Sequence, residues 1–293
     1  MSEFPGRVRR AFADHSAFEQ VDDTTFESTA TTFDGSVEAS EVDLSGLDLD
    51  IKVRKPKEDP LEFDVQTWNL SRGSWSRIDK GDLVRIRLGW DEADVATVCL
   101  GKIETAKPSR DGRDKTYRLK GIDKSEAATK TRISGRWRNR RPDEIVSAIA
   151  GEIGLTPIVE DVGDEIDGAY SVTREQQVRA WLDELLDYAA DMTGTAWEWF
   201  ASRGRLHFVP QTQETVDAPT LSYDNTLLSI QDTTEPDDDV DEKLEFEAML
   251  EPAIEKGAAV YVDTEDFEGA YRVDEYEFQS STESGDHLVR GKC

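Results

Sequence analysis

The chain has 293 residues, and its 63 acidic against 35 basic side chains give a formal net charge of -28 with an isoelectric point near 4.4. So acidic a chain repels nucleic acids and anionic membranes at long range, which excludes a generic nucleic-acid binder. The same excess is typical of proteins that work in concentrated salt, where the Debye length falls to roughly 3 Å at 1 M, so we interpret the chain as halophilic.

The N-terminal segment has no continuous apolar stretch, and no run approaches the length that a membrane span needs, so we expect neither a secretory signal nor stable membrane insertion. A product made in the cytoplasm is therefore expected. Residues 1–30 are polar and unpatterned, and we interpret them as a flexible arm. The length favours several domains after this arm.

Residues 31–127 alternate apolar and polar side chains in several short runs. The clearest runs are 47–53, 83–88, 95–100 and 116–120, and turn signals such as Asp-Gly separate them. Period-two alternation predicts half-buried strands, so this region is expected to form a first antiparallel β-barrel or sheet.

Residues 128–215 change to a helical period. Pro142 stands where a first helical residue belongs, Ile145, Ile149 and Ile153 repeat every four residues, and Gly154 ends the pattern. A second helix is predicted from a capping box at Thr173 and Gln176, through one apolar face, to Gly194. The apolar face of this second helix comprises Val178, Trp181, Leu182, Leu185, Leu186 and Ala189. A hairpin follows, with Ser-Arg-Gly-Arg as its turn, so we expect a small inserted α+β domain.

Residues 216–293 return to strands and repeat the first β region. Four blocks occur in the same order in both regions: 61–63, 78–84, 101–104 and 119–121 match 244–246, 254–260, 269–272 and 289–291. The second block is Ile-x-Lys-Gly-x-x-Val in both copies. We interpret this as an internal duplication, so the predicted fold class is α+β, mainly β, with two similar β-barrel domains.

Motifs for known chemistry are missing from the sequence. The segment 233–243, rich in aspartate, fails the EF-hand pattern, because Glu242 stands where the turn glycine belongs and Ala248 where the bidentate glutamate belongs. The two cysteines and three histidines show no metal-ligand spacing, and no phosphate loop, dinucleotide fingerprint or serine-hydrolase elbow occurs. We therefore expect no metal and no cofactor. Paired carboxylates for glycoside hydrolysis stay open, since 63 acidic residues guarantee close pairs in any fold.

One stretch opposes the overall charge. Residues 130–141 carry six basic side chains and no acidic one. Interpreted as a strand, this basic strip places Trp137 and Asn139 toward the core and its arginines on an exposed face. The candidate contact residues are Arg132, Arg136, Arg138, Arg140 and Arg141. Salt pairing with acidic residues of the same or a neighbouring subunit, or contact with an acidic partner or passing DNA, would each satisfy them.

Taken together, the order of these patterns resembles the baseplate or tail hub proteins of tailed viruses. The resemblance covers roughly residues 37–293 and is carried by Gly-Asp-x-Val-x-Ile-x-x-Gly from Gly81, the helix at 142–155, the second helix ending in Met-Thr-Gly, and the hairpin Arg-Gly-Arg-Leu-His-Phe-Val-Pro from Arg203. In an acidic chain, it suggests a virus of a halophilic archaeon.

The resemblance implies a homotrimer in which two tube-type β-barrels per chain form a pseudo-sixfold ring. Its implied partners are a hexameric tail-tube or distal tail protein ring, the tape-measure protein and a tail tip or fibre protein, with genomic DNA only in transit. It implies a structural virion protein with no lytic activity, located in the tail. The alternative from a different class is a tail-associated glycan hydrolase that uses paired carboxylates. In the hub interpretation, the basic strip would dock onto an acidic neighbouring subunit or tail protein.

Overall fold

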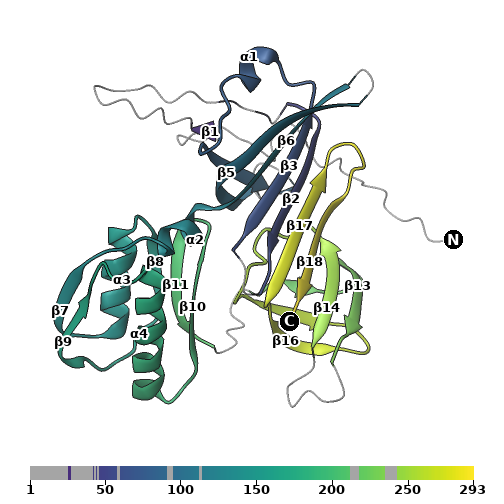
Figure 1. Ribbon diagram of the computed structural model, residues 1–293. Helices are drawn as coiled ribbons and strands as arrows, with labels where there is room; N and C mark the ends of the chain where they lie inside the picture. The colour runs from purple at the N-terminus through teal and green to yellow at the C-terminus, as the bar shows by residue number, and fades with distance from the viewer. Residues whose placement is uncertain are drawn as a thin grey trace.

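The computed structural model describes residues 26–27, 42, 44, 46–57, 60–90, 95–111, 114–211, 218–234 and 243–293 (Figure 1). Most of the predicted arm at 1–30 therefore lies outside the described residues. Its described part, β1 (Phe26–Glu27), pairs antiparallel with β4 (Leu83–Leu88). In these ranges no helix is long and apolar enough to cross a membrane.

A large antiparallel sheet dominates the fold, with ten strands in the described part of the chain. From edge to edge its order is β1, β4, β5 (Ala96–Asp111), β6 (Asp114–Asp123), β3 (Glu62–Trp68), β2 (Leu49–Lys55), β17 (Glu275–Ser281), β18 (His287–Lys292), β14 (Leu244–Met249) and β13 (Leu227–Asp232). The N-terminal and C-terminal β regions meet at β2 and β17, where Val53 lies opposite Phe278. Both regions therefore belong to one sheet.

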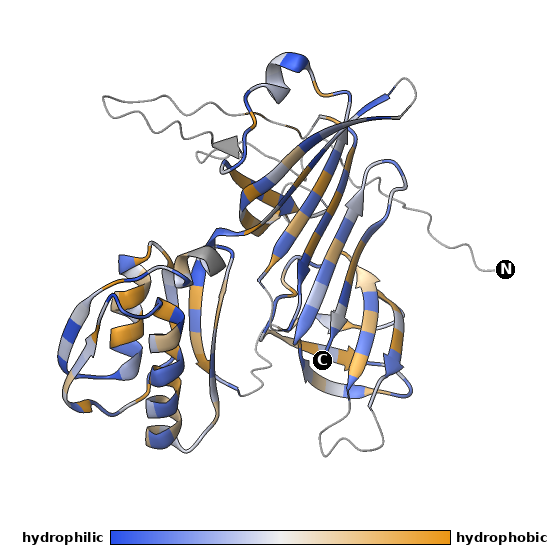
Figure 2. Cartoon of the chain, viewed as in Figure 1, coloured by the Kyte–Doolittle hydropathy of each residue, from blue (hydrophilic) through white to orange (hydrophobic). Residues whose placement is uncertain are grey.

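Alternating side chains explain why these segments are strands. In β2, Leu49, Ile51 and Val53 are buried while the side chains between them face outward, and Figure 2 shows the same apolar and polar bands on neighbouring strands. A smaller sheet of β12 (Thr220–Leu221), β15 (Ala259–Asp263) and β16 (Glu268–Arg272) packs on the same interior. The buried side chains of both β regions form one continuous core. The predicted class, α+β and mainly β, is confirmed, while the domain boundaries at 31–127, 128–215 and 216–293 stay a prediction.

The internal repeat recurs in the strand register. Phe63 of β3 lies opposite Gly121 of β6, and Phe246 of β14 lies opposite Gly291 of β18. In both pairs the phenylalanine ring covers the glycine so closely that an added Cβ would overlap the ring. Each copy thus needs glycine at the same place for the same packing reason.

The turn before the second strand of each copy also has the same hydrogen bonds. The Gly81 N–H donates to the carbonyl of Ile103, and the Gly257 N–H donates to the carbonyl of Val273, at 2.8 Å in both. The residue after each glycine accepts a bond in return, at 2.9 Å in both. The two glycines have φ of 103° and 79°, a region where a side chain would be strained.

One matched pair of glycines from the sequence comparison is wrong. Because Ile103 corresponds to Val273, Gly101 corresponds to Tyr271 and not to Gly269. The cause is a bend: β5 is one long strand that pairs with both β4 and β6, whereas the same stretch of the second copy is divided into β16 and β17.

Residues 128–211 form a separate lobe with its own hydrophobic core, which we call the inserted domain. It follows α2 (Lys124–Thr129), which packs on β5 and β6. Its elements are β7 (Gly135–Arg140), α3 (Pro142–Glu152), β8 (Thr156–Val159), β9 (Ile166–Val172), α4 (Val178–Thr193), β10 (Trp197–Ser202) and β11 (Arg205–Pro210). A single helical turn, α1 (Arg72–Trp75), lies in the first β region.

Both predicted helices are present, but the second begins later than expected. Pro142 is the first residue of α3, and Gly154 has a φ of 74° after the helix. The capping box at Thr173 and Gln176 is wrong, because α4 begins at Val178. The Val178 N–H donates instead to the Thr131 carbonyl at 2.9 Å, so a tertiary contact satisfies the helix end.

Candidate functional site

The basic strip lies along β7 at the outer side of the inserted domain (Figure 1). Within the described residues β7 pairs with β9 alone, so its other edge has no strand neighbour. Arg132, Arg136, Arg138 and Arg140 are exposed, and Arg141 is half-buried. Four of the five predicted arginines are therefore accessible along this segment, and the five differ in their partners.

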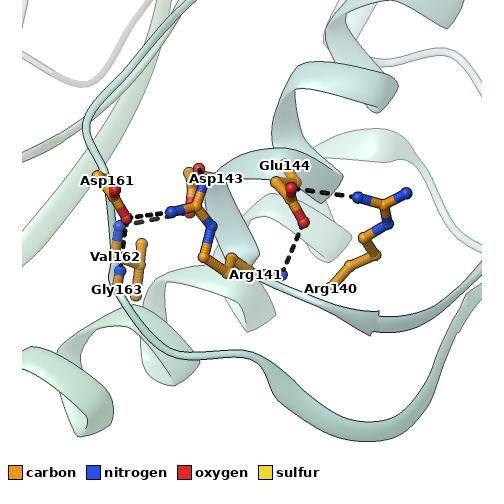
Figure 3. A network of polar contacts seen from close by, with 7 residues as sticks. All are labelled: Arg140, Arg141, Asp143, Glu144, Asp161, Val162 and Gly163. Atoms are coloured by element: carbon orange, nitrogen blue, oxygen red, sulfur yellow. Dashed lines mark hydrogen bonds and ion pairs between the residues drawn. The ribbon is translucent and has the colours of Figure 1, made fainter.

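Arg140 and Arg141 are used within the chain, at the start of α3 (Figure 3). Nη1 of Arg141 lies 2.6 Å from Oδ1 of Asp161, and its Nη2 lies 3.2 Å from Oδ2 of Asp143. Glu144 accepts from the Arg141 backbone N–H at 3.3 Å and from the Arg140 side chain at 3.2 Å. Asp143 and Glu144 lie in the first turn of α3, where negative charge interacts favourably with the helix dipole. This end of the strip therefore has a structural role.

The side chains of Arg136 and Arg138 are different, because they have no hydrogen bond or ion pair with any other described residue. Trp137 between them packs its ring over Gly135 and lies 6.5 Å, centroid to centroid, from the ring of Tyr170. The indole thus anchors the strand, as predicted, and leaves two free guanidinium groups in solvent.

The alternation of the strip ends at Asn139. Its φ of 47° accompanies a register shift between Arg138 and Arg140, and its side chain is exposed. The prediction that Asn139 faces the core is therefore wrong. Arg132, at the other end, donates to the carbonyl of Arg174 at 3.4 Å.

A second polar site, missed by the sequence analysis, surrounds Arg203. This residue and Gly204 form the turn between β10 and β11, with φ of 53° and 79°. The Arg203 side chain is 7% exposed, and its Nη1 and Nη2 donate to the carbonyls of Pro252 and Ile254, both at 3.1 Å. Glu255 lies 3.6 Å away. The tip of the inserted domain therefore holds a loop of the C-terminal β region.

Aromatic rings also surround the buried Arg203 side chain. Its guanidinium carbon lies 5.8 Å from the ring centroids of both Tyr276 and Phe278. Burial works to lower the pKa of Arg203, but Tyr276 and Glu255 hold that pKa above its ordinary value. The buried guanidinium therefore stays charged.

The same hairpin tip is bonded to the N-terminal β region. Asp123, at the end of β6, accepts from the backbone N–H groups of Ser125 at 2.8 Å and of Leu100 and Arg203 at 3.2 Å. The Gly204 N–H donates to the Ser125 hydroxyl at 2.7 Å. Burial raises the pKa of Asp123 above its ordinary value, and these hydrogen bonds to the charged carboxylate offset only part of that rise. Three parts of the chain thus meet at one turn.

A cavity of about 260 Å³ lies between the inserted domain and the C-terminal β region, and Glu160, His207 and Glu255 contribute to its lining. Glu160 and Glu255 are the carboxylates in this lining that a hydrolase could use. Oε2 of Glu255 lies 2.8 Å from Nη2 of Arg205, so this carboxylate is held in an ion pair. Among the described residues, no group of three or more metal-binding side chains is close enough to hold an ion.

His207 gives this region a pH-dependent stability. Burial lowers its pKa to about 4, and its ring stacks on Phe200 at 4.3 Å. The unfolded chain binds the proton near pH 6.5, so the stability that neutral His207 contributes is complete above that pH and is lost as the pH falls toward 4. His207→Gln is expected to reduce the loss of unfolding free energy between pH 7 and 5 by about 2 kcal/mol. Urea titrations of both proteins at the two pH values measure this, and equal losses would contradict it.

No protein-family model matches the chain, and no curated protein matches its sequence. Among solved structures, its fold matches the 43 kDa tail protein of prophage MuSo2 from Shewanella oneidensis, with a TM-score of 0.58 at 14% identity over 84% of this chain and 92% of that one. The fold is that of phage tail proteins.

Two further structures share this tail-protein fold. The tail protein from Neisseria meningitidis MC58 has a TM-score of 0.55 at 10% identity, covering 84% of this chain and 96% of that one. The E. coli c3393 protein has a TM-score of 0.54 at 10% identity, covering 84% and 73%. It is described as a component of the type VI secretion system with structural similarity to the T4 bacteriophage tail proteins gp27 and gp5. The fold expected from the sequence resemblance is confirmed.

Proposed function

We propose that this chain is a structural protein of a virus tail. In this proposal it forms a homotrimeric hub at the distal end of the tail tube and adapts the six-fold symmetry of the tube to a three-fold tip. A hexameric tail-tube or distal tail protein ring, the tape-measure protein and a tip or fibre protein are its proposed partners. The tail-protein fold supports this role, and we propose the virion tail as its location.

The observation that carries the proposal is the duplication. The glycine turns at Gly81 and Gly257 and the phenylalanine–glycine pairs recur at equivalent places in the two β regions. Three chains with two similar regions each present six similar faces, which is what contact with a hexameric ring requires. A unique, unrepeated chain would offer only three.

The proposed ring encloses a channel for the tape-measure protein and later for genomic DNA. With a net charge of -28, a lumen lined by this chain repels a polyanion and lets it pass without binding. We propose no catalytic role. Hydrolysis of host envelope glycan by the purified protein, abolished by one carboxylate substitution, would favour the hydrolase alternative instead.

The test of the hub is absolute mass by light scattering in molar potassium chloride over a range of protein concentrations. A trimer, or a monomer that becomes a trimer on concentration, is expected, and electron microscopy should then show a six-lobed ring. A monomer at every concentration would overturn the trimer proposal.

We also propose that the basic strip docks onto an acidic neighbouring subunit or tail protein. Arg136 and Arg138 are the residues for this role because their guanidinium groups are exposed and unpaired within the described part of the chain. Arg136→Glu with Arg138→Glu should weaken assembly and leave the monomer folded. Unchanged assembly would return the strip to simple charge balance.

A halophilic origin is part of the proposal and gives a salt prediction. Because the acidic excess repels itself at low ionic strength, the midpoint of thermal unfolding should rise steadily between 0.1 and 2 M potassium chloride. Differential scanning calorimetry measures that midpoint. Equal midpoints at both salt concentrations would remove the argument for halophily.

A further inference from the structure

The two free arginines of the basic strip have no counter-charge within the described residues of the inserted domain. Their neighbours Arg140 and Arg141 already use Asp143, Glu144 and Asp161. Arg136 and Arg138 have no acidic partner among the described residues of the same chain. A protein partner for this pair would therefore come from outside the described part of the protomer.

The densest acidic segment of the sequence lies outside the described residues. Residues 235–242 carry six acidic side chains and no basic one, and we call them the acidic tract. The residues that flank it lie at the end of the hairpin where β13 leads to β14. There the Thr233 N–H donates to the Lys243 carbonyl at 2.8 Å, and the Lys243 N–H donates to the Thr234 hydroxyl at 2.8 Å. The tract therefore leaves and rejoins the fold at one fixed place.

The basic strip and the residues that flank the acidic tract lie on opposite sides of the molecule. The hairpin of β13 and β14 ends one side of the large sheet, while β7 lies on the far side of the inserted domain (Figure 1). A contact between unlike patches on opposite sides of identical subunits is heterologous, and such contacts close into rings when the rotation is right. A trimeric ring provides three identical contacts of this kind.

We propose that the acidic tract of one protomer docks on the basic strip of the next, with its carboxylates against Arg136 and Arg138. This inference rests on the proposed trimer and names a contact within it. The partner is a second copy because the complementary charges are opposite extremes of the same sequence: six basic side chains within residues 130–141 against six acidic side chains within residues 235–242. Arginine guanidinium groups suit carboxylates in this role.

Cross-linking between differently tagged chains tests the contact. One chain carries Arg138→Cys, and the other carries Asp237→Cys, Asp238→Cys or Asp239→Cys, all with Cys293→Ser. Mixed under mild oxidation, they should form a disulfide between chains, because close approach of two segments brings Cα atoms within the roughly 7 Å that a disulfide needs. The matched control replaces Arg138→Cys with Arg179→Cys, an exposed arginine on α4 of the same domain, which should not cross-link.

Light scattering on the same mixtures separates the possible failures. A trimer in which none of the three tract cysteines cross-links to the strip overturns the docking and leaves the hub proposal intact. A persistent monomer overturns both. Cross-linking at the control position as strong as at Arg138 would show random encounter and would also overturn the docking.

Charge reversal gives an independent measure. Arg136→Glu with Arg138→Glu should raise the protein concentration for half-assembly about tenfold, since reversal removes the attraction of two exposed pairs and adds repulsion. Asp237→Lys with Asp238→Lys in the same chain should restore assembly. Arg54→Glu with Arg179→Glu, two exposed arginines elsewhere, is the matched control and should assemble like the unaltered chain. Failure of the reciprocal lysines to restore assembly would contradict the pairing.

Discussion

Replacing Arg203 with methionine is expected to lower the free energy of unfolding by about 3–5 kcal/mol. The substitution keeps an unbranched side chain but leaves the carbonyls of Pro252 and Ile254 without their donors. Each buried acceptor without a partner costs about 1–3 kcal/mol. The inserted domain also loses its hold on the C-terminal β region, so limited proteolysis should cleave between the two before global unfolding. Urea titration in molar potassium chloride measures the loss.

Arg205→Met is the matched control for Arg203→Met. Arg205 lies two residues along the same hairpin and pairs with the same Glu255 at 2.8 Å, but its side chain is 34% exposed. An exposed ion pair contributes about 0–1 kcal/mol, so this variant should lose little. Similar losses in the two variants would mean that the buried carbonyl contacts of Arg203 do not hold the junction together.

Local structure was largely predictable because local signals agree with the fold. Alternation predicted β2 and β4, Pro142 and Gly154 marked α3, and the Arg-Gly turn marked the β10–β11 hairpin. The repeat was visible because glycine is required twice for the same reason, under a phenylalanine ring and at a positive φ. Such constraints act over a few residues and leave a mark in the sequence.

Long-range joins left no comparable mark. The pairing of β2 with β17 links segments more than two hundred residues apart, and alternation cannot say which strand edges meet. The start of α4 depends on the Thr131 carbonyl, which is remote from the predicted cap. Arg203 offered one usable signal: an arginine stands at the first positive-φ position of a turn where asparagine or glycine is usual. A costly residue at such a position indicates a tertiary role.

The basic strip shows how far composition alone can lead. Six basic residues within positions 130–141 predicted one uniform surface, yet α3 supplies carboxylates to Arg140 and Arg141 while Arg136 and Arg138 remain free within the described residues. The difference follows from position: a register shift at Asn139 interrupts the alternation of β7, and Arg140 and Arg141 lie beside the first turn of α3. Among the described arginines of the strip, Arg136 and Arg138 are therefore the two whose side chains have no contact to give up when a partner binds.

Gly121→Ala is expected to lower the free energy of unfolding by about 3 kcal/mol or more. A Cβ at this position would overlap the backbone carbonyl of Lys102 on β5 and come within 2.8 Å of the Phe63 ring. Backbone in a paired strand has little room to move, so the three strands β3, β5 and β6 would have to separate. Gly151→Ala, in α3 with no atom within 4 Å of the added Cβ, is the control and should be neutral or stabilising by up to about 1 kcal/mol.

The equivalent glycine of the second copy should respond differently, and the comparison tests the repeat itself. At Gly291 the three atoms nearest to an added Cβ all belong to the Phe246 ring, a side chain that can move, so Gly291→Ala should cost about 1–3 kcal/mol. Phe246→Leu in the same chain should relieve part of that cost, since the smaller side chain leaves space for the methyl group. Phe63→Leu should not relieve Gly121→Ala to the same extent, because the Lys102 carbonyl remains. Chemical denaturation of the four single and two double variants measures both couplings, and equal couplings would mean that backbone contact does not distinguish the two copies.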